Sequence, residues 1–125
     1  MSRTQRIAAF SSVGLLLATT RLNSEDLLRM QVSPAVSRAP AVLTIRVSVE
    51  PSSDDRSLQI AAESATFYRS SEIELDGTSA TAHQVVEFRN LPAGLYQVTG
   101  VLVGTRGPRA TVLRTAKVEP SPGSR

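Results

Sequence analysis

The chain has 125 residues, of which 41% are hydrophobic and 20% charged, a composition typical of one globular domain and too short for two. It contains no cysteine, which excludes disulfides, thiolate metal sites, cysteine nucleophiles and a lipid-modified N-terminal cysteine. The net charge of +3 does not indicate nucleic-acid binding, because residues 22–125 contain 11 basic and 11 acidic side chains and the excess lies in residues 1–21.

The N-terminal segment is typical of a secretory signal peptide. Residues 1–6 are basic, and residues 7–18 form an uncharged, mostly apolar run that is too short to span a bilayer. We therefore predict a signal peptide over residues 1–20, cleaved after Thr20, and a periplasmic or secreted protein of a bacterial cell envelope, because a small eukaryotic secreted domain would more often contain disulfides. No Ala-x-Ala cleavage motif follows the apolar run, so an uncleaved helix packed on the domain, or a true start at Met30, stays open.

Residues 21–40 are predicted to form a short helix and a linker. The sequence Asn-Ser-Glu-Asp-Leu-Leu-Arg-Met at 23–30 offers capping residues and acids in the first turn of a helix, although a frayed linker fits equally well. Residues 33–40, with Pro34 near the start and Pro40 at the end, read as extended chain.

Residues 41–119 are predicted to form an all-β domain, because their apolar residues recur with a period of two. The predicted strands cover residues 41–49, 58–63, 73–75, 83–89, 96–102 and 110–118, with residues 66–70 as a candidate seventh. The fifth has apolar side chains on both faces and should be central, and a change of phase predicts a bulge near Arg114 in the last. Six to seven strands at this spacing favour a single antiparallel β-sandwich, followed by a disordered tail at 120–125.

The segment between the fourth and fifth strands is the most specific motif. Leu91-Pro92-Ala93-Gly94-Leu95-Tyr96-Gln97-Val98 resembles the Leu-Pro-x-Gly-x-Tyr-x-Val signature of bacterial Ig-like, fibronectin type III-like and carboxypeptidase regulatory-like domains. The resemblance implies that Tyr96 buries its ring and bonds its hydroxyl to upstream backbone. It further implies that Gly94 has a positive φ and that Leu91 fills the core beneath the corner. Pro92 suits a turn in its own right, because it fixes φ and lacks an N–H.

Residues with catalytic chemistry are few. His83 is the only histidine, and a triad with Ser79 and Asp76 lacks any Gly-x-Ser-x-Gly context. A surface role for His83 is favoured, and the alternative is a small hydrolase or metal-dependent enzyme that uses His83 with nearby acids.

Two pairs of acids invite a metal or catalytic reading. Asp54-Asp55 could bind Ca²⁺, but two acids beside Arg56 supply too few oxygens and suit a turn cap. Glu72 and Glu74 share one strand face, where a solvated surface is favoured over a catalytic pair. No cofactor and no metal site are predicted.

Four residues are candidate partner contacts. Phe67 and Tyr68 form the densest aromatic spot, although plugging one end of the sandwich is the favoured role, and Arg106 and Arg109 flank the last hairpin loop. The sequence thus predicts a non-catalytic exported β-sandwich module for protein binding, adhesion or envelope assembly, with an unidentified protein partner and no nucleic acid.

Overall fold

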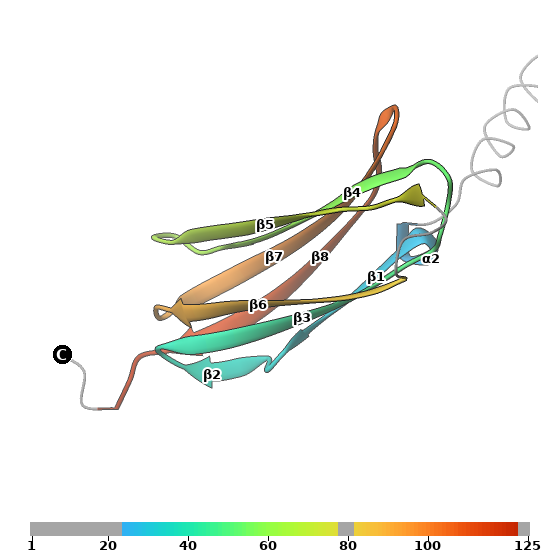
Figure 1. Cartoon of the computed structure of the whole chain (residues 1–125). Coiled ribbons are helices and arrows are strands. Elements are labelled where there is room, and N and C mark those ends of the chain that lie inside the picture. Colours follow the sequence, from blue (N-terminus) through green and yellow to red (C-terminus); the bar gives the residue numbers. More distant parts are fainter. Residues whose placement is uncertain (1–23, 78–81, 123–125) are drawn as a thin grey trace, which may run out of the picture.

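The computed structural model describes residues 24–77 and 82–122, so the predicted signal peptide lies outside the described residues. The described chain forms two β-sheets packed face to face (Figure 1). Within these ranges no helix has the length and apolar character needed to cross a membrane.

The smaller sheet has three strands in the order β1-β3-β6, all antiparallel: β1 (Leu28–Ser33), β3 (Ala41–Val49) and β6 (His83–Leu91). The larger sheet has five strands in the order β2-β8-β7-β4-β5: β2 (Val36–Arg38), β8 (Gly107–Glu119), β7 (Gly94–Gly104), β4 (Asp55–Glu63) and β5 (Tyr68–Glu74). β7 is the central strand of the five, in agreement with the apolar residues on both of its faces.

The core lies between the two sheets and consists mainly of aliphatic side chains. Leu43 and Ile45 of β3 are fully buried, and Ile60 of β4 and Val98 of β7 are fully buried opposite them. Burial of each such side chain contributes about 1.5–3 kcal/mol to the free energy of folding. The side chains that make the period-two alternation in the sequence are therefore the ones whose burial stabilises the fold.

The prediction of a helix and linker over residues 21–40 is corrected by the structure. Only Ser24–Leu27 forms a helical turn (α2), and β1 follows at once, with Leu28 and Met30 buried against the core. A helix this short gains little by itself, whereas the alternation of Leu28, Met30 and Val32 lets the segment pair with β3.

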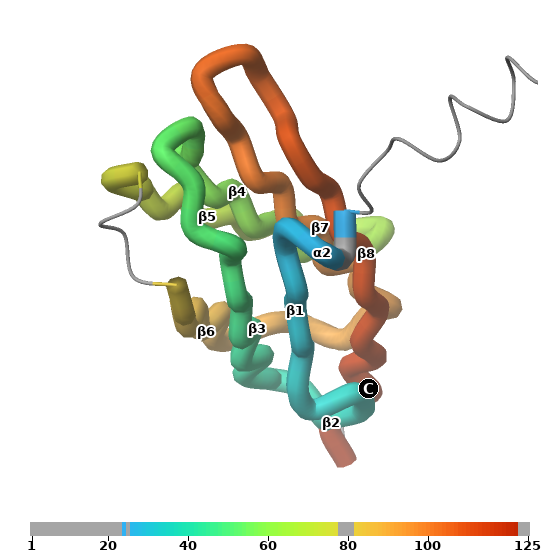
Figure 2. The backbone as a smooth tube through the Cα atoms, turned by 90° about the vertical axis from the view of Figure 1, so that its right-hand side faces the viewer, coloured from blue at the N-terminus to red at the C-terminus, as the bar shows by residue number. Residues whose placement is uncertain are grey.

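The chain then changes sheet. The three residues of β2 pair in parallel with the end of β8, and β1 lies alongside β8 where the two sheets meet (Figure 2). The sandwich is therefore not purely antiparallel, and the described residues contain eight strands instead of the predicted six or seven. Part of the predicted disordered tail is ordered, because the Ser121 hydroxyl donates a hydrogen bond to the carbonyl oxygen of Ala39; residues 123–125 of that tail lie outside the described residues.

Two strand details also differ from the prediction. The separate segments at 66–70 and 73–75 are one strand, β5, which pairs with β4 over its whole length. The bulge in β8 lies at Arg109, where the register shifts between Ala110 opposite Leu102 and Pro108 opposite Val103, and not near Arg114. Proline cannot donate to the ladder, so the irregularity falls beside Pro108.

Candidate functional site

The corner before β7 has the hydrogen bond that its resemblance implies. The Tyr96 ring is fully buried, and its hydroxyl donates to the carbonyl oxygen of Pro92 at 2.7 Å. Leu91 is also fully buried beneath the corner. These residues stabilise the turn and present no reactive group to solvent.

The positive φ that the family resemblance implies for Gly94 is not observed. Gly94 does not have a positive φ; the left-handed residue of the corner is Asn90, with a φ of 60°. Asparagine tolerates that conformation better than most residues. Gly94 packs closely against Ser64 instead, because an added Cβ would lie 3.1 Å from the Cβ and 3.2 Å from the Oγ of Ser64, and Ser64 would have to shift to accommodate it.

The aromatic spot at residues 67–69 closes one side of the sandwich. Phe67 packs edge-on against Tyr96, with ring centroids 6.5 Å apart, and the Arg69 guanidinium lies over the Phe67 ring at 5.2 Å. Arg69 also donates from Nη1 to the carbonyl oxygen of Arg89 at 2.7 Å, which links β5 of one sheet to β6 of the other. Tyr68 points outward and is 60% exposed.

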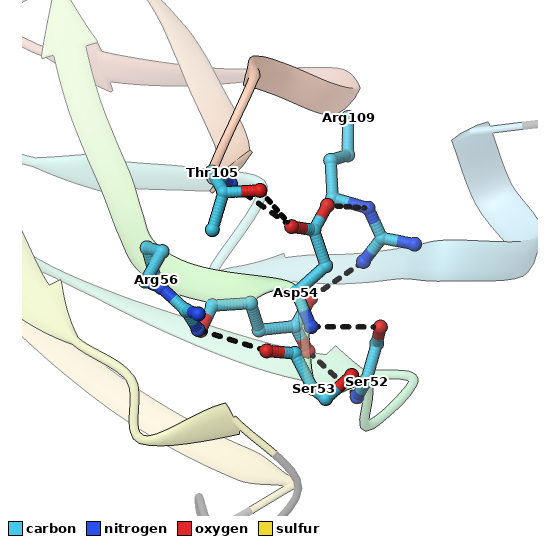
Figure 3. Close-up of polar contacts among 7 residues, drawn as sticks. Ser52, Ser53, Asp54, Arg56, Thr105 and Arg109 are labelled. Carbon is cyan, nitrogen blue, oxygen red and sulfur yellow. Dashed lines mark hydrogen bonds and ion pairs between the residues drawn. The ribbon is translucent and has the colours of Figure 1, made fainter.

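Asp54 meets Thr105 and Arg109 of the β7–β8 hairpin in a polar cluster (Figure 3), and Asp55 belongs to the same cluster through its ion pair with Arg109. Asp55 is buried, accepts a bond from the backbone N–H of Ser52 at 3.1 Å, and pairs with Arg109 Nη1 at 2.6 Å. Asp54 accepts bonds from the hydroxyl and backbone N–H of Thr105, and its other oxygen lies 3.4 Å from Arg109 Nε. A calcium ion here would have to displace Arg109 from both carboxylates.

The Asp54 carboxyl responds electrostatically to these neighbours. Hydrogen bonds from the Thr105 hydroxyl and backbone hold the pKa of Asp54 below its ordinary value of 3.8, and the positive charges of Arg109 and Arg56 act in the same direction. The cluster therefore joins the β3–β4 loop to the hairpin loop as a structural contact. Arg109 belongs to this contact, and Arg106 is exposed at the hairpin loop.

His83 lies at the start of β6 on the outer face of the three-stranded sheet. Its Nδ1 is 3.1 Å from the Ser48 hydroxyl of β3. Ser79, the nucleophile of the imagined triad, lies outside the described residues. Within residues 24–77 and 82–122, no three His, Cys, Asp or Glu side chains are grouped so that they could hold a metal ion.

Arginines gather around His83 in a shallow, open pocket of about 610 Å³ on that outer face. The polar residues that line it are Arg29, Gln31, Arg46, Ser48, His83, Gln84 and Arg114. Sequence reasoning did not single out Arg29 and Arg46, because 17 residues separate them and the strand pairing between β1 and β3 was not predicted. The outward phase of Arg46 between Ile45 and Val47 was the only signal.

The outer face of β7 and β8 has the opposite character. Its outward positions contain no charged side chain from Leu95 to Val103 on β7, and only Lys117 from Thr111 to Lys117 on β8. Leu95 is 70% exposed and Leu113 is 48% exposed on this face. Glu72 and Glu74 are exposed on β5, at the edge of the same sheet.

No protein-family model and no curated protein matches the chain. Among solved structures, the chain is similar to the superoxide reductase (neelaredoxin) from Ignicoccus hospitalis, with a TM-score of 0.56 and 13% identity over 74% of this chain and 80% of that one. It is also similar to a family 76 glycoside hydrolase from a bovine Bacteroides thetaiotaomicron strain, with a TM-score of 0.50 and 14% identity over 73% of this chain and 20% of that one. At these identities the similarity shows a β-sandwich fold alone.

Proposed function

We propose that the chain is an exported, non-catalytic β-sandwich module that binds a protein partner through the outer face of β7 and β8. The observation that supports it is the near absence of charge on that face. In a sheet with one face on the core and one face in water, the outward side chains are normally charged or polar. The central part of a protein–protein interface, by contrast, is depleted of charged residues. Here threonine, valine, leucine and glutamine occupy the outward positions of β7 from Leu95 to Val103 and of β8 from Thr111 to Thr115, and the charged Lys117 follows them on β8.

The proposal includes an immunoglobulin-like or fibronectin type III-like subtype. Its support is the tyrosine corner at Tyr96 and the passage of the chain from β1 in one sheet to β2 in the other. Export rests on the composition of residues 1–20. Intact-mass analysis of protein from the cell envelope tests it: the expected mass lacks residues 1–20, and a full-length cytosolic product would contradict export.

A matched pair of charge insertions tests the binding face. Leu113→Arg places a charge in the uncharged part of the β7–β8 face, whereas Val42→Arg places the same charge on the other sheet, where Val42 is 38% exposed. Both positions are exposed, so both variants should keep the thermal midpoint of the native protein. Crosslinking in the envelope fraction should capture a specific partner with the native chain and the Val42→Arg variant, at a yield several-fold above that with Leu113→Arg.

Equal capture by all three proteins would place the partner elsewhere and contradict the proposal. The catalytic alternative has its own test, the replacement of His83 by alanine. A hydrolytic activity of the purified protein that disappears in His83→Ala would overturn the non-catalytic assignment.

A further inference from the structure

We propose that the outer face of the three-stranded sheet binds a short acidic segment of a partner protein, with Arg29 and Arg46 as two adjacent carboxylate receptors. This surface is on the other sheet from the β7–β8 face and does not depend on it. A result that contradicts one proposal therefore leaves the other unaffected.

The strand register brings the two arginines together. Arg29 of β1 lies opposite Ser48 of β3, and Arg46 of β3 lies opposite Gln31 of β1. Arg29 and Arg46 are thus diagonal neighbours on adjacent strands, about 7–8 Å apart at the backbone. Successive side chains of a strand point to opposite faces of the sheet. Met30 follows Arg29 and Val47 follows Arg46, and both Met30 and Val47 are buried in the core, so the two arginines point outward.

Both guanidinium groups are available to a ligand. Within residues 24–77 and 82–122, neither Arg29 nor Arg46 lies within ion-pair distance of an acid, and no acid lines the pocket. Arg114 of β8 adds a third positive charge at the edge of the pocket. An arginine binds a carboxylate with two parallel hydrogen bonds, which makes it the natural receptor for this group.

The rest of the pocket suits a polypeptide. When the Ser48 hydroxyl donates to Nδ1 of neutral His83, the hydrogen of the ring remains on Nε2 and can be donated to a ligand. Gln31 offers an amide, and Val85, which is 61% exposed, offers an apolar contact. A peptide carries carboxylates, amides and apolar side chains together, whereas a simple inorganic anion would use only the charges.

The surroundings of the pocket disfavour a broad polyanion. Asp26 and Glu50 line the adjoining hollow together with Arg29 and His83. A bilayer or a nucleic acid extends over tens of ångströms and would have to approach these acids as well. A compact ligand with two charges can bind the arginines and avoid them.

The spacing of the arginines predicts the pattern of the ligand. Alternate residues of an extended chain lie on one face about 6–7 Å apart. A segment with the pattern Glu-x-Glu or Asp-x-Glu therefore presents two carboxylates at nearly the separation of Arg29 and Arg46.

The test is fluorescence anisotropy on the full chain at low salt. The probe is a labelled peptide with Glu-Val-Glu in a Gly-Ser background, and the control peptide carries Gln-Val-Gln. We expect the acidic peptide alone to bind, and Arg29→Gln and Arg46→Gln each to weaken binding by about tenfold, as for loss of a charged hydrogen-bond pair. The matched control is Arg38→Gln, an exposed arginine of β2 in the other sheet, which should leave binding unchanged.

Three results would overturn the proposal. The first is equal binding of the two peptides. The second is stronger, Arg46-dependent binding to vesicles of phosphatidylglycerol and phosphatidylcholine, which would assign the site to a membrane. The third is self-association in sedimentation that is lost in both Arg46→Gln and the Glu72→Gln/Glu74→Gln double variant, which would make the ligand the Glu-x-Glu segment on β5 of a second copy.

Discussion

Replacing Tyr96 by phenylalanine isolates the hydrogen bond of the corner. The ring stays in its fully buried position against Phe67, and only the bond from the hydroxyl to the carbonyl oxygen of Pro92 is lost. A net contribution of about 1 kcal/mol is typical for such a bond. Pro92 is exposed, so water can replace the lost donor at the carbonyl, and the cost should not rise much above that value.

Urea unfolding followed by far-ultraviolet circular dichroism measures this loss, because the chain has no tryptophan for fluorescence. The midpoint should fall with an unchanged m-value, and the thermal midpoint should fall by roughly 4–8 °C for a domain of this size. The control is Tyr68→Phe, since Tyr68 is 60% exposed and its hydroxyl bonds to no other described residue. An unchanged midpoint for Tyr96→Phe, or an equal loss for Tyr68→Phe, would refute the reasoning.

Gly94→Ala should destabilise by about 1–3 kcal/mol through overpacking against Ser64, and Ser64→Gly should relieve much of that loss in a double-mutant cycle followed by urea unfolding. Arg109→Ala should lower the free energy of unfolding by about 3 kcal/mol, because it leaves the buried Asp55 carboxylate without a cation. Asp55→Ala should lower it by less, and calorimetry of the two variants measures the difference. The hydrogen bonds from Thr105 that lower the pKa of Asp54 favour its ionised form, so they stabilise the folded protein above pH 3.8. This contribution is lost as the pH falls through the pKa of Asp54 in the folded protein. Thermal midpoints of the native protein and Asp54→Asn should therefore differ at neutral pH and converge well below pH 3.8; a constant difference would contradict the sign.

The local alternation of apolar and polar residues was sufficient to predict those strands that bury one face in the core. The alternation around Leu43 and Ile45 predicts β3 with its bounds at 41 and 49, because a one-residue slip would expose every core side chain. The apolar residues on both faces of β7 likewise predict its central place in the sheet. The same reasoning missed β1, where Ser24 to Asp26 favour a helix and only pairing with β3 stabilises the strand.

The candidate sites depended on contacts between distant parts of the chain. Asp55 caps its turn, as the sequence predicts, by accepting a hydrogen bond from the Ser52 N–H, but its ion pair with Arg109, 54 residues away, has no signal in the local sequence. Arg29, Arg46 and His83 were three unrelated polar residues until the order β1-β3-β6 placed them on one surface. Register and sheet order follow from packing of the whole core, which no short window of sequence contains.

The sequence by itself determined that residues 41–119 are mainly β-strand, that a tyrosine follows the Pro- and Gly-containing corner, and that the excess positive charge lies in residues 1–21, because alternation, turn chemistry and composition are local properties. Only the tertiary structure decided that residues 28–38 belong to both sheets and that Asn90 takes the left-handed conformation. It also decided that the outward positions of β7 from Leu95 to Val103 and of β8 from Thr111 to Lys117 contain only one charged side chain, Lys117, whereas arginines lie together on the outer face of the other sheet. These features arise from which strands become neighbours, and that choice is made by burial of the common core.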